Sequence, residues 1–243
     1  MVALARTDSV AELPAANEPD SELDTLRQHA LFSSFSEDDF RAIGRQVRRV
    51  SLAQRELLYR QDTPAQHFYF VVSGRLRLFR LDASGIERTL DSLAPGDCFA
   101  EVMIYADPAR YACYAEALKS SEVLVIPIRA YRDVLEQSPA YAESVLRHYA
   151  SRAVARFHDL EIMTLQNARD RLVRYLLDLL PDGLTGNAEV ELPLPKCLVA
   201  SRLAMQPETL SRVLHELKSN GLVRVDRGRV FIQDPGRLFQ VSQ

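Results

Sequence analysis

Residues 194–232 read LPKCLVASRLAMQPETLSRVLHELKSNGLVRVDRGRVFI. The apolar spacing predicts two short helices, over 196–204 and 207–219, joined by a tight turn. Pro207 suits a first helical turn, where its missing N–H costs nothing, and Gly221 suits the left-handed residue that ends a helix. Two short strands around a second Gly turn follow as a hairpin. The stretch therefore predicts a winged helix-turn-helix.

The second helix has two distinct faces. The apolar face consists of Leu210, Val213, Leu214 and Leu217, and the polar face of Glu208, Ser211, Arg212 and His215. The Arg212 fork matches O6 and N7 of guanine, Glu208 can accept from N4 of cytosine, and Ser211 can contact either type of base. A glutamate is a poor ligand for a phosphate group, because both are anionic. Its place beside Arg212 therefore predicts that the helix recognises specific base pairs in double-stranded DNA. The alternative is the solvated face of an ordinary amphipathic helix, and the preceding helix and turn count against it.

Charge is unevenly distributed along the chain. Residues 1–167 carry 19 Lys and Arg against 24 Asp and Glu, whereas residues 168–243 carry 11 against 9. Within 196–237 the balance is 8 against 4, and Arg227 in the hairpin is a candidate phosphate contact. An acidic body with a basic tail fits an anionic partner for the tail alone. Ordinary charge scatter remains the other interpretation of these counts.

The remaining chain divides into three further parts. Residues 1–22 read as a flexible leader, rich in Ala, Glu, Pro and Ser. Residues 23–138 open with two short helices, the second capped by Ser36, and continue as strands punctuated by Gly turns. The clearest strands are Phe68–Val72, Arg75–Leu81, Ile86–Leu93 and Val123–Ile128. Short strands at roughly ten-residue spacing predict an antiparallel β-roll, so the fold class is α+β.

Residues 139–167 predict one long helix with a heptad seam. The seam positions are Ala142, Leu146, Tyr149, Ala153, Arg156, Leu160, Met163 and Asn167. A second apolar stripe, formed by Ala150, Val154 and Phe157, is expected to pack on the roll. Two usable faces favour a parallel homodimer, and the alternative is a single amphipathic helix lying on its own domain. Residues 168–243 would then form the DNA-binding domain.

Composition excludes several other classes of protein. The chain has 243 residues, of which 47% are hydrophobic and 26% charged, as in ordinary globular proteins. No apolar run approaches a membrane span, and no signal peptide is evident. Three distant cysteines, Cys98, Cys113 and Cys197, suit a reducing cytoplasm better than a disulfide framework. No nucleophile–base pair or metal triad appears, so we do not expect an enzyme.

From about residue 23 to 235 the sequence resembles the CRP/FNR superfamily of bacterial transcription regulators. The matching features include Gly74 after Phe-Tyr-Phe-Val-Val, Pro95-Gly96-Asp97, and the recognition signature Glu-x-x-Ser-Arg at Glu208, Ser211 and Arg212. Phe99-Ala100-Glu101, Asn167-Ala168 and Arg174-Tyr175-Leu176-Leu177 look most like the DNR subgroup, which responds to nitric oxide. The resemblance implies a cyclic-nucleotide-binding-like sensor domain, a dimer, a palindrome of TTGA-like half-sites and contact with RNA polymerase. It also implies that the protein activates genes under anaerobic or denitrifying conditions.

Two sensing chemistries of the family do not match this sequence. In the cyclic-nucleotide branch an Arg-Ser pair grips the phosphate, and Tyr111-Ala112 stand here instead. An anionic phosphate buried without its Arg would be costly, so we do not expect cyclic AMP. The iron–sulfur branch needs four thiolates, three of them near the N-terminus, and this chain has three cysteines, none before Cys98. An iron–sulfur cluster is therefore excluded.

The remaining expectation is an apolar effector pocket between the roll and the long helix. Its candidate residues are Phe99, Glu101, Tyr111, Arg156 and Phe157. By resemblance to the DNR subgroup, haem would bind there and sense nitric oxide, with His29 as an axial ligand. A surface or capping role is the other interpretation of His29 and of His67, His148 and His158. A different ligand, no ligand at all, and a cyclic-nucleotide-binding module without DNA binding are the alternative functions.

Overall fold

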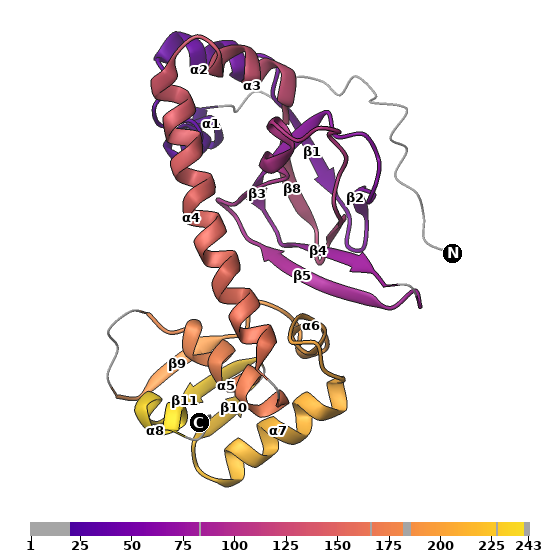
Figure 1. Ribbon diagram of the computed structural model, residues 1–243, viewed down its shortest axis with the longest axis vertical. Coiled ribbons are helices and arrows are strands. Elements are labelled where there is room, and N and C mark those ends of the chain that lie inside the picture. Colours follow the sequence, from indigo (N-terminus) through magenta and orange to yellow (C-terminus); the bar gives the residue numbers. More distant parts are fainter. Residues whose placement is uncertain (1–19, 83, 166, 182–185, 227, 241–243) are drawn as a thin grey trace. The chain divides into compact units, whose positions relative to one another are not determined.

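The computed structural model describes residues 20–82, 84–165, 167–181, 186–226 and 228–240 (Figure 1). The chain divides into two compact units. The first comprises Met1–Arg80 with Leu90–Arg152, and the second comprises Leu81–Thr89 with Ala153–Gln243. Most of the expected leader, residues 1–19, lies outside the described residues, and its last residues belong to the first helix.

Two four-stranded sheets form the β-roll of the first unit. One has the strand order β1 (Arg48–Leu52), β8 (Ser121–Pro127), β3 (His67–Ser73), β6 (Cys98–Phe99). The other has the order β2 (Leu57–Tyr59), β7 (Tyr114–Ala117), β4 (Leu76–Leu81), β5 (Glu87–Leu93). The pairings of β3 with β8 and with β6 are antiparallel. The four strands expected from the sequence are therefore found, with their ends shifted by one or two residues.

Helices gather at one end of the roll, around the beginning of α4 (Figure 1). They are α1 (Asp20–Gln28), α2 (Glu37–Gly44), α3 (Ile128–Leu135) and α4 (Pro139–Thr164), with a 3-10 turn η1 (Glu101–Ile104). Ser36 caps α2 as expected, since its hydroxyl accepts from Asp39 N at 3.2 Å. Phe32 is fully buried against Phe68 and Tyr131. These aromatic contacts join the N-terminal helices to the sheet, because burying such rings contributes heavily to stability.

The second unit contains the winged helix-turn-helix. Its elements are α5 (Ala168–Asp178), β9 (Ala188–Glu191), α6 (Lys196–Arg202), α7 (Pro207–Ser219), β10 (Val223–Asp226), β11 (Arg229–Ile232) and α8 (Pro235–Gln240). The strands form one sheet in the order β10-β11-β9. Asn167, expected at the end of the helical seam, instead caps α5, because its side chain accepts from Asp170 N at 2.9 Å. The α+β fold class expected from the sequence is confirmed.

No helix in the described part of the chain is both long enough and apolar enough to span a membrane.

Candidate nucleic-acid interface and effector site

The helix α7 presents the predicted recognition face to solvent. Pro207 occupies its first turn, and Leu210, Val213, Leu214 and Leu217 bury its apolar face. Glu208, Ser211, Arg212 and His215 are all exposed. Among the described residues, none of these four side chains forms an ion pair or a hydrogen bond with a neighbour. Their polar groups therefore remain available to a partner, and all four lie on the outward side of one rigid helix.

The orientation of α7 is fixed by its contacts with α5 and α6. Arg171 of α5 donates from Nε to Leu203 O at 2.9 Å and from Nη1 to Leu165 O at 2.8 Å. Nη1 of Arg169 lies 3.1 Å from Oε1 of Glu216 on α7. Ala204, in the turn between α6 and α7, has a φ of 50°. Two arginines of α5 therefore hold the end of α6 and the side of α7, which preorganises the recognition helix.

The hairpin that follows α7 is the expected wing. Its strands pair from Val223 with Ile232 to Asp226 with Arg229. Arg227, the candidate phosphate contact, lies outside the described residues. The sequence interpretation missed the third strand, β9, which pairs with β11. Its alternation of Ala188 and Val190, both buried, with exposed Glu189 and Glu191 is a period-two signal that could have predicted it.

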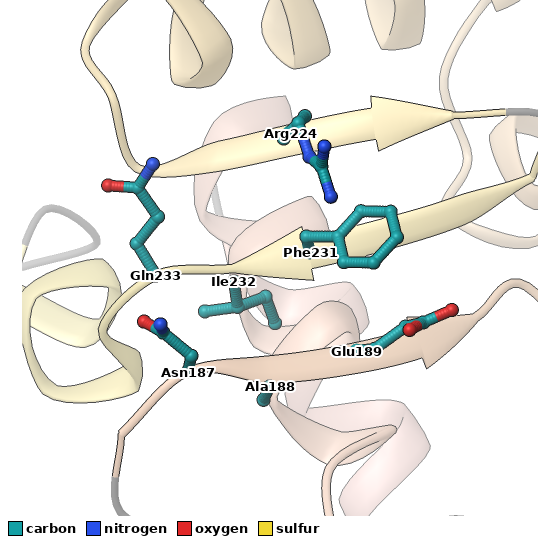
Figure 2. Close-up of a pocket in the computed structure, with 7 residues that line it drawn as sticks. All are labelled: Asn187, Ala188, Glu189, Arg224, Phe231, Ile232 and Gln233. Atoms are coloured by element: carbon teal, nitrogen blue, oxygen red, sulfur yellow. The ribbon is translucent and has the colours of Figure 1, made fainter.

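A shallow cavity of about 320 Å³ lies on this sheet. Its lining consists of Asn187, Ala188, Glu189, Arg224, Phe231, Ile232 and Gln233. Figure 2 shows Arg224, Phe231 and Glu189 on three neighbouring strands. The Arg224 guanidinium lies 4.1 Å from the centre of the Phe231 ring, so a cation–π contact holds both side chains on the surface. None of these residues was a candidate from the sequence.

Phe99 and Tyr111, expected in the effector pocket, lie in the packed interior of the roll. Together with Tyr59 and Tyr69 they form a cluster that we call the aromatic quartet. The Tyr59 and Tyr111 rings stack with centres 3.9 Å apart, and the Tyr69 and Phe99 rings with centres 5.2 Å apart. All four residues are at most 6% exposed. Phe99 and Tyr111 are therefore both packed against other rings of the roll.

Glu101, the third candidate, is buried beside α4. Nε of Arg152 lies 3.2 Å, and Nε2 of His148 3.6 Å, from Oε1 of Glu101. The hydroxyl of Tyr149 donates to Glu101 O at 2.6 Å. Sequence reasoning missed these α4 partners, although His148 and Arg152 share a helix face at a spacing of four. The guanidinium compensates the carboxylate, because an unpaired buried charge would be costly.

Arg156 and Phe157, the remaining candidates, belong to the second unit. Nη1 of Arg156 lies 2.8 Å from Oδ2 of Asp159. Phe157 is 70% exposed and Val154 69% exposed. The packing of this stripe on the roll, and the place of Phe157 in an effector pocket, stay predictions.

His29, the candidate haem ligand, lies in the turn after α1. Its Nδ1 accepts from Leu31 N at 3.2 Å, and its ring meets those of Phe70 and His148 edge-on at 6.1 and 5.4 Å. Burial, and secondarily the nearby His148, lowers the pKa of His29 from 6.5 to about 4, so the imidazole is neutral.

A neutral imidazole could bind iron, but a haem also needs an apolar slot for its macrocycle. Two of the rings expected to line that slot, Tyr111 and Phe99, stack on Tyr59 and Tyr69. Among the described residues no three His, Cys, Asp or Glu side chains are grouped to hold a metal ion. Haem binding with His29 as an axial ligand therefore stays a prediction.

Ala100, between β6 and η1, has a left-handed backbone with φ 60° and ψ 10°. Ala100→Gly should raise the free energy of unfolding by about 1 kcal/mol, because this conformation costs a residue with a Cβ roughly 1–2 kcal/mol. Chemical denaturation followed by circular dichroism measures the change. The control is Ala112→Gly, at an exposed residue outside the left-handed region, which should lose up to about 1 kcal/mol. Equal shifts in the two variants would contradict the strain assigned to Ala100.

Known proteins share both the roll and the helix-turn-helix of this chain. The chain matches a cyclic nucleotide-binding domain over residues 49–138 and a Crp-like helix-turn-helix domain over residues 170–241. It is 30% identical over 195 residues to the cyclic AMP receptor protein of Thermus thermophilus, with 80% of this chain and 88% of that protein covered. The chain belongs to the CRP/FNR family of transcription regulators.

Other members of the CRP/FNR family align over nearly the whole chain. The crystal structure of DNR from Pseudomonas aeruginosa is 31% identical, covers 92% of this chain and 98% of that one, and has a TM-score of 0.51. The transcriptional activator protein anr of the same species is 26% identical over 239 residues, covering 95% and 94% of the two chains. The family assignment made from the sequence is confirmed, and in this CRP/FNR regulator α7 is the second helix of the helix-turn-helix.

Proposed function

We propose that this chain is a dimeric, sequence-specific DNA-binding transcription regulator that reads DNA with α7. The observation that carries the proposal is the exposed row Glu208, Ser211, Arg212 and His215 on a helix whose other face is buried. Such a helix fits the major groove, where its N-terminal residues reach base edges. Regulators of this kind act on the genome, so we place the protein in the cytoplasm.

Recognition of specific bases would depend on Glu208 and Arg212, in the N-terminal half of α7. By resemblance to the FNR branch, the half-site is TTGA followed by T or C. Arg212 would contact the guanine with both arms of its fork, and Glu208 the cytosine paired with it. Ser211 and His215 extend the same face, and Arg227 of the wing would contact phosphate. RNA polymerase is the partner expected once the site is occupied.

Dimerisation would use the exposed apolar side of α4. Leu146, Val154, Phe157 and Leu160 are all at least 60% exposed. Leu146 and Leu160 are two heptads apart, which places them on one seam. Burying such a stripe against a second copy removes large apolar side chains from water. Two recognition helices related by a two-fold axis would then read a palindrome with half-site centres roughly 34 Å apart.

The effector of the regulator could be nitric oxide at a haem, cyclic AMP or no ligand at all. Resemblance to the DNR subgroup favours nitric oxide at a haem, but Phe99 and Tyr111, two of the rings expected beside it, are stacked on other rings of the roll. The replacement of the phosphate-gripping Arg-Ser pair by Tyr111-Ala112 disfavours cyclic AMP. Tight packing at Phe99 and Tyr111 favours the alternative of a regulator with no ligand in the roll.

The variant Arg212→Ala tests the proposed contact between Arg212 and the guanine of the half-site. The variant should lose about 1–3 kcal/mol of discrimination between the palindrome and a duplex with its G·C pairs inverted, because a bidentate contact is worth that amount. Fluorescence anisotropy with both duplexes at fixed salt measures the ratio of affinities. The matched control is Lys218→Ala, which removes one exposed cation from the last turn of the same helix and should leave the ratio unchanged. A wild-type ratio in Arg212→Ala would refute the assignment.

A further inference from the structure

We propose that the sensor domain carries its effector within its own chain. The aromatic quartet of Tyr59, Tyr69, Phe99 and Tyr111 occupies the interior of the roll in the way that a bound effector would. DNA binding therefore requires no small molecule. This inference rests on the proposed DNA-binding function.

The quartet is packed as closely as an ordinary protein core. Tyr59 stacks on Tyr111 with an angle of 12° between the rings, and Tyr69 on Phe99 with an angle of 24°. Tyr59 and Tyr69 join the two stacks, with ring centres 5.4 Å apart. Offset or stacked rings at such distances attract one another beyond the gain from burial. A guest in this space would have to replace these contacts, not merely enter a void.

The polar atoms of the quartet are also satisfied from within the chain. The hydroxyls of Tyr69 and Tyr111 lie 2.9 Å apart, and the Tyr111 hydroxyl donates to His67 O at 2.8 Å. Burial raises the pKa of Tyr111 above its ordinary value of 10, so the hydroxyl stays neutral. The side chains of the quartet therefore offer neither a cation for a phosphate nor an orphaned donor for a carbonyl.

The quartet is connected to α4 by a short path. Phe99 ends β6 and pairs with Tyr69 of β3. The next residue is the strained Ala100, followed by Glu101, whose backbone carbonyl accepts from Tyr149 and whose carboxylate faces Arg152. A shift of Phe99 would therefore move Glu101 against α4. The packing of the quartet and the position of α4 are therefore coupled through these contacts.

The test is a ring deletion with chemical rescue. Tyr111→Ala removes a ring and hydroxyl equal to one phenol molecule, and an apolar cavity of this kind binds a small aromatic guest. We expect the wild-type protein, refolded without small molecules, to bind the palindrome, and its affinity to change less than about twofold with cyclic AMP, haemin or phenol. Tyr111→Ala should bind the palindrome at least roughly tenfold more weakly, and saturating phenol should restore most of the loss.

Three further variants separate the loss of the Tyr111 ring from the loss of its hydroxyl and from the loss of a ring elsewhere. Tyr111→Phe keeps the ring and should retain DNA binding without phenol. Tyr114→Ala deletes a ring on the next strand, stacked on Phe79 outside the quartet, and should show no phenol rescue. If Tyr111→Ala is unfolded at the assay temperature, Tyr111→Leu is the second variant. It deletes the aromatic ring but leaves too small a hole for phenol, so it should bind the palindrome more weakly than wild type and show no rescue by phenol.

Two outcomes would overturn the inference while leaving the proposed function intact. One is wild-type protein that binds the palindrome only with haemin or cyclic AMP present. The other is a folded Tyr111→Ala that binds DNA as tightly as wild type, with or without phenol. Wild-type protein that fails to distinguish the palindrome from the inverted duplex under every condition would instead contradict the proposed function.

Discussion

Replacing Leu160 with Glu is expected to convert the protein from a dimer to a monomer. Leu160 is 60% exposed on α4, two heptads from Leu146 on the proposed seam. In a parallel dimer the two substituted side chains would meet across the seam and bury two like charges. Because burial costs several kcal/mol per ion, the dissociation constant of the dimer should rise by about three orders of magnitude. Sedimentation velocity at micromolar concentration measures the change.

The same variant should bind the palindrome no more tightly than it binds a single half-site, because a monomer presents one recognition helix. Ala155→Glu is the matched control. Ala155 is exposed and lies on the opposite side of α4 from the seam, since each helical residue advances about 100°. It adds the same charge and should remain dimeric. Dimeric Leu160→Glu protein would refute the seam, whatever its affinity for DNA.

Gly74→Ala is expected to destabilise the sensor domain by roughly 3 kcal/mol or more, by adding left-handed strain to overpacking. Gly74 has a φ of 92°, and a Cβ at this position would lie 2.2 Å from Oγ and 2.5 Å from Cα of Ser121. The Ser121 hydroxyl cannot easily move, because it donates to Lys119 O and accepts from Arg75 N. Chemical denaturation of the full chain measures the loss.

Gly85→Ala provides the control for backbone strain alone. Gly85 also has a positive φ, of 78°, but a Cβ there meets nothing within 4 Å. Its substitution should cost only about 1–2 kcal/mol, the price of the left-handed conformation. Equal losses in the two variants would show that the close approach of Ser121 to Gly74 is not part of the native fold.

The parts of the molecule predicted from the sequence are those encoded by local patterns. The α7 face of Leu210, Val213, Leu214 and Leu217 repeats at helical spacing, and Pro207 sets the beginning of the helix. Such periodicity needs no knowledge of distant contacts. The recognition face follows at once, because it is what remains when the apolar face is buried. The strand β9 was missed because its four residues give only a brief alternation.

The interior of the sensor domain could not be predicted in the same way. Tyr111 is 42 residues from Tyr69 in the sequence, and the two side chains meet only because the roll brings their segments together. Arg77 illustrates the same limit, because strand alternation predicts an outward side chain. It is instead buried, pairing with Glu116 at 3.1 Å and stacking on Phe79. A charge enters the interior only with a partner, and that partner lies 39 residues away.

The most direct test of the central claim is an anisotropy titration of wild-type protein with a duplex carrying two inverted TTGA half-sites, beside the same duplex with both G·C pairs inverted. Two protomers should bind each duplex, and the palindrome should be bound at least roughly 100-fold more tightly than the inverted control. Equal affinity for the two duplexes at physiological salt, or one protomer per palindrome, would contradict it.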